Sequence, residues 1–335
     1  MKKGKVLRRF VLFAFIVVFA FSALPATAAD KTGWPDQLRF MAGPPGGNWF
    51  ALGTALADMW TNSDLPQTTS STGGGVANII NAGSGKGDLG FSVTSLLGAA
   101  IKGEADFEGK SVKNAVIMSN LYTQYTYFVI RKDYAQKNDV KSVGDIIKKQ
   151  LPIRFATLKP GTASEFVVNA LFNKGYNINY KDEFKKWGGS IEYASYEGGA
   201  DLLADNHLDC FAFSVGKIAS IVMNIESKVD ILLLPVEQEA LDALSEAYGT
   251  VTFTIEPGQY KSVTEPVKAV GDYTCIVIRE DLPESLVYEL NKAIWANKAA
   301  LEAAVKDMSE LEPAIALPTT LPAHPGSVKF WKEVQ

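Results

Sequence analysis

Cysteine and histidine are scarce in this chain of 335 residues, which has two of each. Cys210 and Cys275 both lie in apolar runs, where cysteine behaves as a small buried hydrophobe, although a disulfide between them is possible in an oxidising compartment. His207 lies in a polar turn and His324 in a proline turn, and the four residues have no spacing that suits a metal ion. We therefore expect neither a metal site nor a cofactor.

Motifs that mark common enzymes are also missing. The chain has no Gly-x-Ser-x-Gly sequence, so a hydrolase with a Ser/His/acid triad has no support. Residues 83–87 (Gly-Ser-Gly-Lys-Gly) lack both the upstream glycine and the trailing Ser or Thr of a phosphate-binding loop. We expect no catalytic residues; an enzyme acting on small acids remains an alternative, which turnover would reveal.

Positive charge is in deficit. The chain holds 33 Lys and Arg against 37 Asp and Glu, and five of the basic residues fall in the first nine positions. Without residues 1–28 the balance is 28 basic to 37 acidic, a net charge of −9. This balance argues against nucleic acid and against an anionic membrane surface as partners. An anionic ligand would have to be held by local groups.

One long apolar run is present, at the N-terminus. Basic residues precede the run at 11–24, and Ala26-Thr27-Ala28 gives a small-x-small cleavage pattern after it. The run is short for a membrane span, although an uncleaved anchor is the alternative. The pattern predicts a signal peptide at 1–28, cleaved near Ala28, and export to a bacterial periplasm. We expect a mature protein that is not embedded in the membrane.

Strand-like and helix-like stretches alternate along the rest of the chain, which is typical of an α/β fold with a mostly parallel sheet. The pattern predicts strands at 38–42, up to about 71, and at 88–93, 115–121, 153–157, 209–214 and 230–234. It predicts helices after 48, from about 75, and at 162–173, 199–205 and 283–306.

Two further runs are alike. Residues 125–131 read Tyr-Thr-Tyr-Phe-Val-Ile-Arg and residues 273–279 read Tyr-Thr-Cys-Ile-Val-Ile-Arg. We interpret them as two strands that link two domains. A chance likeness between two core strands is the alternative, because such runs are common in sheets.

Three turns, at 43–48, 71–75 and 160–164, are rich in Gly, Ser and Thr and precede predicted helices. Helix N-termini offer unpaired N–H groups and a favourable dipole to an anion, and in open α/β sheets such turns gather where ligands bind. One such turn could be a simple helix cap. Three turns in two domains, with Trp49, Phe50 and Tyr122 beside them, favour an anion-binding cleft with an aromatic wall.

The motifs also resemble, in order, those of the TAXI family of TRAP-transporter substrate-binding proteins, over essentially the whole mature chain. The resemblance rests on residues 46–53 (Gly-Gly-Asn-Trp-Phe-Ala-Leu-Gly), 71–78 (Ser-Thr-Gly-Gly-Gly-Val-Ala-Asn), 88–89, 121–122, 141–145, 160–162, Asp209 and 324–326 (His-Pro-Gly). It implies a two-lobed periplasmic-binding-protein fold of type II. Each lobe would be a mixed, mostly parallel sheet flanked by helices, with lobe I at 29–127 and 273–335 and lobe II at 128–272.

The resemblance further implies a monomeric receptor without enzymatic activity. It would capture a small organic anion by hinge closure: a dicarboxylate, a keto acid, or an acidic amino acid, such as 2-oxoglutarate or glutamate. It would then deliver the ligand to the TRAP permease subunits in the membrane. The alternative is the same fold used as a sensor that reports to a receptor kinase.

Carried over by position, the resemblance implies a set of ligand-binding residues, whereas the turn at His324 would be structural. The set consists of Gly46, Gly47, Asn48, Trp49, Ser71, Thr72, Gly73, Gly74, Asn78, Thr94, Ser95, Tyr122, Thr162, Ser164 and Gly216.

The chain departs from the family pattern around this site. Gly75 stands where Ser is usual, Ala77 where Glu is frequent, and Ala163 where Gly is usual; Val93 and Ser95 replace a common Gln and Asp, and the acidic residue after Tyr122 is missing. These changes leave the ligand open.

Overall fold

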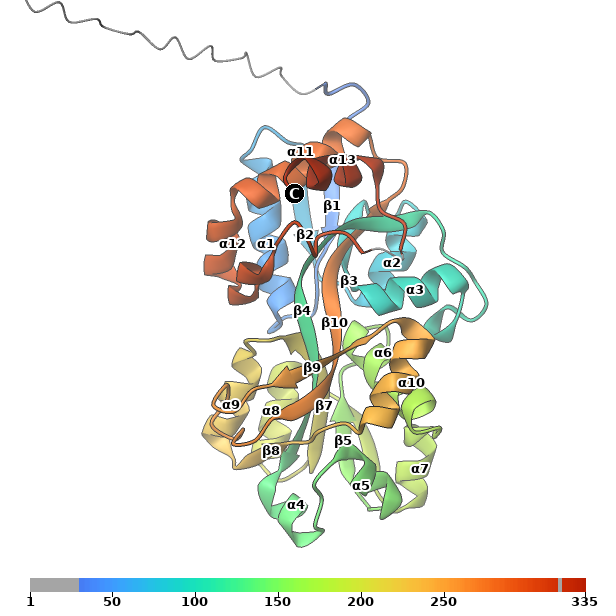
Figure 1. The fold of residues 1–335 in the computed structure, drawn as a ribbon, viewed down its shortest axis with the longest axis vertical. Coiled ribbons are helices and arrows are strands. Elements are labelled where there is room, and N and C mark those ends of the chain that lie inside the picture. Colours follow the sequence, from blue (N-terminus) through green and yellow to red (C-terminus); the bar gives the residue numbers. More distant parts are fainter. Residues whose placement is uncertain (1–29, 319–320) are drawn as a thin grey trace, which may run out of the picture. The chain divides into compact units, whose positions relative to one another are not determined.

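Two long strands, β4 (Ala115–Arg131) and β10 (Val267–Arg279), lie side by side at the centre of the fold (Figure 1). The structure is a computed structural model that describes residues 30–318 and 321–335. The predicted signal peptide at 1–28 lies outside the described residues. Residues 31–335 form one unit, and the fold described below is the fold of that unit.

The lobe drawn uppermost in Figure 1 is built from both ends of this unit. Its N-terminal part alternates strands with helices: β1 (Gln37–Met41), α1 (Asn48–Thr61), β2 (Gln67–Ser71), α2 (Gly75–Gly83), β3 (Leu89–Val93), α3 (Thr94–Lys102) and the 3₁₀ helix η1 (Ala105–Phe107). After β10 the chain returns to it with α11 (Glu284–Ala296), α12 (Lys298–Ala304), the 3₁₀ helix η3 (Lys306–Glu310) and α13 (Pro325–Glu333).

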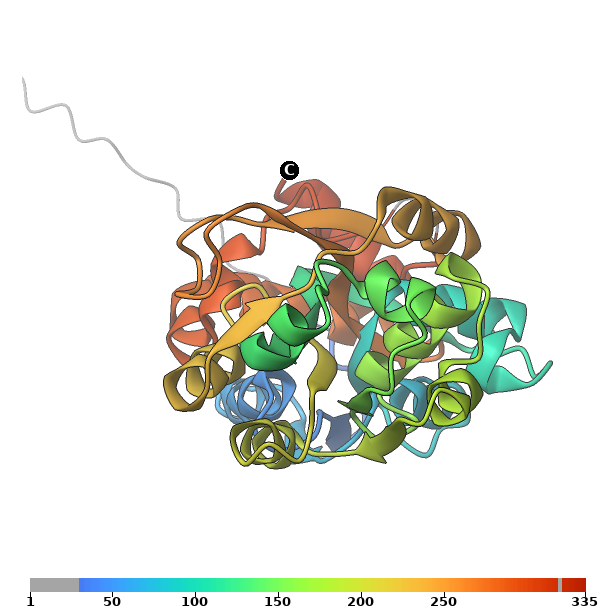
Figure 2. The ribbon, with the colours of Figure 1, turned by 90° about the horizontal axis from the view of Figure 1, so that it is seen from below.

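The second lobe holds the chain between β4 and β10. Its strands are β5 (Arg154–Thr157), β6 (Ser190–Tyr193), β7 (Cys210–Gly216), β8 (Ile231–Leu233) and β9 (Val251–Ile255). Helices surround them, as the view from below shows (Figure 2): α4 (Lys132–Lys137), α5 (Val143–Lys148), α6 (Ala163–Ala170), the π-helical η2 (Leu171–Gly175), α7 (Tyr180–Lys186), α8 (Tyr196–Ala204), α9 (Ser220–Lys228) and α10 (Gln238–Tyr248).

One mixed sheet of ten described strands connects the lobes. Its order is β2-β1-β3-β10-β4-β7-β5-β6, and β8 and β9 pair with β4 and β10. The pairs within each lobe are parallel (β1 with β2 and β3, β5 with β6 and β7), whereas pairs that involve β4 or β10 are antiparallel. The predicted α/β class with a mixed, mostly parallel sheet in each lobe is confirmed.

The linking strands are longer than the sequence pattern predicts. The expected strands at 115–121 and 125–131 form the single strand β4, and the run at 273–279 is the second half of β10. The polar residues between the expected strands do not interrupt β4, because Gln124 accepts a hydrogen bond (2.7 Å) from Thr274 of β10. The predicted lobe boundaries near 127 and 273 fall inside these strands.

The long helix predicted at 283–306 is broken at Asn297. This residue ends α11, and its side-chain amide donates to the carbonyl of Ala293 at 2.9 Å. The amide side chain thus satisfies a carbonyl at the helix end, where intrahelical partners run out.

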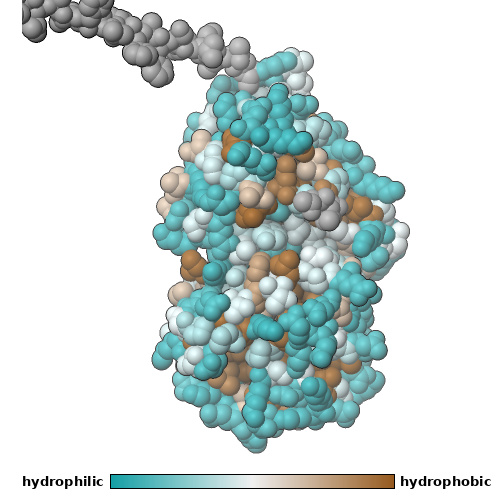
Figure 3. Space-filling model, viewed as in Figure 1, coloured by the Kyte–Doolittle hydropathy of each residue, from teal (hydrophilic) through white to brown (hydrophobic). Residues whose placement is uncertain are grey.

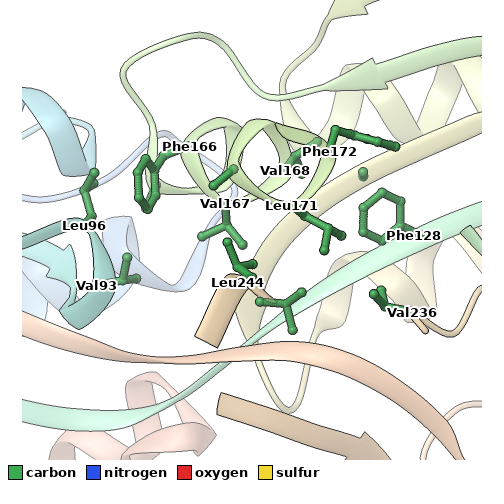
Figure 4. Packing of buried hydrophobic residues seen from close by; sticks show 14 of the residues in the cluster. Val93, Leu96, Phe128, Phe166, Val167, Val168, Leu171, Phe172, Val236 and Leu244 are labelled. Atoms are coloured by element: carbon green, nitrogen blue, oxygen red, sulfur yellow. The ribbon is translucent and has the colours of Figure 1, made fainter. Parts of the chain in front are cut away.

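An apolar cluster crosses from one lobe to the other (Figure 4). Leu96 of α3 belongs to the same cluster as Phe166 of α6 and Leu244 of α10. The cluster continues into the second lobe around Phe128 and Phe172. The two lobes therefore share hydrophobic packing in addition to their two strands.

Both cysteines are buried strand residues, as expected, and both are free. Cys210 pairs with Ile130 and Cys275 with Asn120, ten positions apart along β4. That is a separation of roughly 30 Å for extended chain. The fold thus rules out the disulfide that the sequence left possible.

The turn at His324 is structural, as expected. The side chain caps α13: Nδ1 accepts from the amide of Gly326 (3.2 Å) and Nε2 lies 2.9 Å from the carbonyl of Leu282. Because a carbonyl only accepts, Nε2 carries the proton and the ring is neutral. The turn thereby fixes α13 to Leu282, two residues before α11.

Candidate small-molecule cavity

A small cavity lies where the two lobes face each other, beside β4. Its walls come from the N-termini of α1, α2, α6 and α8, the middle of β4 and the C-terminal end of β7. Its free volume is about 20 Å³, which is room for about one water molecule. The lining residues are Pro44, Gly47, Asn48, Trp49, Gly74, Tyr122, Gln124, Leu158, Thr162, Ala163, Ser164, Tyr196, Ser214, Val215 and Gly216.

Eight of the predicted ligand-binding residues line this cavity. They are Gly47, Asn48, Trp49, Gly74, Tyr122, Thr162, Ser164 and Gly216. The three Gly/Ser/Thr-rich turns at 43–48, 71–75 and 160–164 each contribute at least one of them. The structure thus brings together three turns, of which the first and the last are more than one hundred positions apart in the sequence.

Glycine is the N-cap residue of both α1 and α2. Neither Gly47 nor Gly74 offers a side chain that could bind the first-turn N–H groups. The amide of Phe50 donates to the carbonyl of Gly47 (3.1 Å) and that of Val76 to the carbonyl of Gly161 (3.2 Å), so the amides that precede them in each helix are the ones left for a ligand. Both positions are also tightly packed: a Cβ on Gly47 would lie 2.9 Å from Tyr196 Cε2, and one on Gly74 would lie 2.7 Å from the carbonyl oxygen of Gly161. The absence of a side chain at both positions therefore leaves the backbone donors uncapped and lets the lobes approach each other closely.

The wall from α6 is different, because its hydroxyl groups already have backbone partners. Thr162 caps the helix, accepting from the amide of Glu165 (3.2 Å) and donating to the carbonyl of Lys159 (2.8 Å). The hydroxyl of Ser164 donates to the carbonyl of Ser214 (3.0 Å) and accepts from its amide (2.9 Å). Both side chains shape the wall, and Ser164 also holds α6 to β7.

The phenol of Tyr122 is a fully buried polar group of the wall. The side chain is 0% exposed, and its Oη has no hydrogen-bond partner among the described residues. The neighbouring hydroxyl of Thr274 is already engaged, accepting from Trp49 Nε1 (3.1 Å) and donating to Gln124 (2.7 Å). Burial raises the pKa of Tyr122 well above its usual value, so the phenol keeps its proton and can donate it in a hydrogen bond.

Aromatic rings complete the wall. Trp49 is half-buried and packs on Phe91, with ring centroids 5.6 Å apart, whereas its neighbour Phe50 is 41% exposed. The hydroxyl of Tyr196 donates to the carbonyl of Ser214 at 3.0 Å. Tyr196 was not predicted as a site residue, because α8 begins three residues before the helix predicted at 199.

Two predicted site residues, Thr94 and Ser95, serve the start of α3 instead of lining this cavity. Thr94 Oγ1 donates to Asp272 at 2.5 Å, and the hydroxyl and amide of Ser95 bind the same carboxylate. Asp272 thus fills the anion position at this helix N-terminus. Both residues line another hollow, of about 310 Å³, which the segment around Ile315 borders.

Asn78 also lies outside the cavity wall. Its amide nitrogen contacts the carbonyls of Met41 (3.0 Å), Ala42 (2.9 Å) and Phe91 (2.8 Å), and its oxygen accepts from the amide of Gly74 (3.2 Å). The side chain thereby fixes the turn that carries Gly74 to the ends of β1 and β3. The role that these contacts support is positioning.

The remaining predicted residues flank the turns. Gly46 adopts a positive φ of 84° and lies next to Tyr196, whereas Ser71 and Thr72 are exposed and Gly73 packs against the side chain of Asn78. None of these four is among the residues that line the cavity in the described part of the chain.

An acidic residue that the sequence did not indicate lies directly behind the wall. Asp307 of η3 accepts from Asn48 Nδ2 (2.7 Å) and from the amide of Ile218 (2.9 Å). Burial raises its pKa to about 6, so the side chain is mostly ionised at pH 7. The lining residues themselves include no Lys, Arg, Asp or Glu among the described positions. Donors for an anion are therefore neutral groups: backbone N–H groups, the phenol of Tyr122 and the side-chain amides of Asn48 and Gln124.

The outer surface is mainly hydrophilic with scattered hydrophobic patches on the face drawn in Figure 3. Across residues 30–318 and 321–335, no helix combines the length and the apolar character needed to cross a membrane. The same residues contain no cluster of three or more His, Cys, Asp or Glu side chains placed to hold a metal ion.

The model of the NMT1-like family matches residues 40–334, nearly all of the described chain. The chain belongs to the NMT1-like family. This family is of the periplasmic solute-binding type, and the match includes both lobes and every residue of the cavity wall.

Solved structures agree on the fold. MatC from Rhodopseudomonas palustris, determined with bound malate, is 15% identical to this chain; the match covers 90% of this chain and 96% of MatC, with a TM-score of 0.51. The periplasmic binding protein BugD is 14% identical over 90% of this chain and 94% of its own, with a TM-score of 0.52. At this identity the likeness concerns the fold, and it confirms the two-lobed periplasmic-binding-protein architecture.

Proposed function

We propose that this protein is a periplasmic receptor that binds a small organic anion in the cavity between its lobes. The observation that carries the proposal is the unpartnered Tyr122 phenol in a wall where two glycine-capped helices also have their N-termini. These groups would donate hydrogen bonds to a carboxylate, and Trp49 and Tyr196 would exclude water. Such a wall, apolar with a few aimed donors, is the usual build of a small-molecule site.

Ligand capture would proceed by closure of the two lobes. With about 20 Å³ free, the cavity as seen here is smaller than a four- or five-carbon acid. The lobes would therefore open for the ligand and close less tightly around it than they do here. The contacts to both lobes that the ligand makes would favour this closed form over the open one.

The ligand class we propose is a dicarboxylate, a keto acid or an acidic amino acid, such as 2-oxoglutarate or glutamate. The malate bound to MatC, which shares the fold, is an acid of this size class. The motifs shared with TAXI-type receptors support delivery to a TRAP permease in the membrane after export by the signal peptide at 1–28. Binding without turnover is part of the proposal.

A thermal-shift screen tests the binding proposal. The protein, freed of carried-over ligand by unfolding and refolding, is heated with malate, succinate, 2-oxoglutarate, glutamate and neutral sugars. An acid present at about 1,000 times its Kd adds roughly 4 kcal/mol of stability and raises Tm by several degrees. A rise with one class of acid and none with the sugars is the expected result. No shift with any acid would contradict the proposal.

A further inference from the structure

Asp307 connects the two lobes on the side of the cavity. Its side chain comes from η3, which follows α12 in the first lobe, and it is 1% exposed. One carboxylate oxygen accepts from Asn48 Nδ2 of α1, in the same lobe, at 2.7 Å. The other accepts from the amide of Ile218, just beyond the end of β7 in the second lobe, at 2.9 Å.

The second lobe is shaped to receive this carboxylate. Gly216, the last residue of β7, has no side chain, and a Cβ there would overlap the carboxylate of Asp307. The missing side chain lets the carboxylate approach the backbone. There the amide of Lys217 lowers the pKa of Asp307 by hydrogen bonding, in opposition to the effect of burial. The end of β7 thus forms a small concavity of backbone donors that an acid from the other lobe fills.

The same residues also form the cavity wall. Asn48 and Gly216 line the cavity from opposite lobes, and Asp307 joins them from behind. A buried carboxylate is costly unless donors surround it, and here one donor comes from each lobe. When the lobes separate, the hydrogen bond between Ile218 and Asp307 is lost. The amide of Ile218 and the carboxylate of Asp307 must then form hydrogen bonds with water instead.

We propose that Asp307 is a latch that holds the two lobes closed behind the cavity and positions Asn48 and Gly216 in its wall. The latch acts with or without a bound ligand, because its partners are the protein's own groups. It therefore biases the free receptor toward the closed form. This bias adds to the one that the contacts of a bound ligand would supply.

Glu310 provides a matched control on the same 3₁₀ helix. Its carboxylate accepts from the amide of Thr123 at 2.8 Å and from the hydroxyl of Thr123 at 2.6 Å, on β4. These contacts fix η3 to the linking strand and involve no group of the loop at 216–218. Glu310→Gln thus perturbs the same helix and removes a similar charge, but it keeps every hydrogen bond of the latch. The charge of Glu310 raises the pKa of Asp307, so its loss favours the ionised carboxylate and does not weaken the latch.

The test measures the distance between the lobes by pulsed electron spin resonance. Spin labels are attached to Asp58→Cys on α1 and Ser227→Cys on α9, both exposed positions, in protein expressed from its full-length sequence. Cys210 and Cys275 are both 0% exposed and do not compete for the label. The labelled protein, without added ligand, is compared with its Asp307→Ala, Asp307→Asn and Glu310→Gln versions.

We expect the population at long distances to rise about tenfold or more in Asp307→Ala, as the loss of a hydrogen bond to a charged group predicts. Asp307→Asn, whose oxygen can still accept one of the two bonds, should give a smaller rise, and Glu310→Gln none. Formate, added to Asp307→Ala, should fill the vacated concavity and restore the short distance.

Circular dichroism shows whether each variant is folded. If Asp307→Ala does not fold, Asp307→Asn alone decides. Distance distributions of the folded Asp307 variants that match the unsubstituted protein would overturn the proposal, and so would an equal shift in Glu310→Gln. Because the variants are compared without added acid, that comparison is independent of the outcome of the thermal-shift screen.

Discussion

At the scale of single residues, the site depends on which polar groups are already used and which are not. Ser164 and Thr162 are fully engaged with backbone groups, whereas Tyr122 is buried without a partner. A buried hydroxyl without a partner costs free energy, and a ligand acceptor would recover it. Such a contrast depends on side-chain geometry and is invisible in the sequence.

Tyr122→Phe tests the role assigned to this phenol. We expect acid binding to weaken by a factor of about ten or more, because a hydrogen bond to a charged group is lost. The thermal stability of the free protein should stay the same or rise, because no internal hydrogen bond is removed. Isothermal titration with the acid found in the screen measures the first effect and Tm the second. Unchanged affinity would remove Tyr122 from the site.

His324 gives the fold a pH dependence of known sign. Burial lowers the pKa of His324 below its value of 6.5, whereas the carbonyls of Leu282 and Glu280 and the charges of Glu280 and Glu284 oppose the shift. Below about pH 6.5 the unfolded chain therefore binds more protons than the folded one, and stability falls with decreasing pH.

His324→Asn isolates this contribution, because Asn also caps helices but does not titrate. Between pH 7.5 and 5.0 the unsubstituted protein should lose more stability than the variant, by at most about 1.4 kcal/mol per pH unit. Urea unfolding at both pH values measures the difference. An equal loss in the two proteins would mean that His324 titrates normally in the folded state.

At the scale of elements, the N-termini of α1 and α2 were predictable from the sequence. A glycine-rich turn between a strand and a periodic apolar run is a local signal, and both helices begin where it places them. Whether such a turn faces a ligand depends on residues that are far away in the sequence. Thr94 and Ser95 also begin a helix, yet Asp272 from β10 occupies their donors.

Gly74→Ala tests the approach of α2 to the second lobe. The backbone of Gly74 is extended, with a φ of −158°, so alanine fits the conformation, but its Cβ would lie 2.7 Å from the Gly161 carbonyl oxygen. In the acid-bound form, which we propose is closed less tightly, the added Cβ would still crowd the gap between the lobes at the turn that binds the acid. We expect acid affinity to fall at least about tenfold with little change in Tm, as titration and thermal unfolding would measure.

Gly98→Ala is the control for this substitution. Gly98 lies within α3, where a Cβ would make only an ordinary contact, 3.7 Å from Leu321. Alanine there should leave affinity unchanged and add up to about 1 kcal/mol of helix stability. Equal affinities of the Gly74 and Gly98 variants would contradict the role given to the turn at 71–75.

At the scale of the whole molecule, alternation of strands and helices predicted the fold class, and the like sequences at 125–131 and 273–279 pointed to the linking strands. The full lengths of β4 and β10 were not predictable, because cross-strand pairs such as Gln124 with Thr274 are non-local. The role of Asp307 was not predictable for the same reason, because its partners lie 259 and 89 positions away in the sequence.

The lobe boundaries at 127/128 and 272/273 remain a prediction. We propose that β4 and β10 bend near these positions when the lobes open, while the apolar contact of Leu96 with the second lobe loosens. Hydrogen exchange compared with and without an acid ligand should then show protection at the turns 46–49, 71–75 and 160–164, which face each other from both lobes. Protection confined to one lobe would argue against closure.

The most direct test of the account is isothermal titration of the ligand-free protein with malate, succinate, 2-oxoglutarate and glutamate. We predict that one class of these acids binds saturably, with one molecule per chain, and that the concentration of the acid is unchanged after prolonged incubation. The absence of saturable binding by every acid would contradict a receptor for small organic anions, and consumption of the acid would indicate an enzyme.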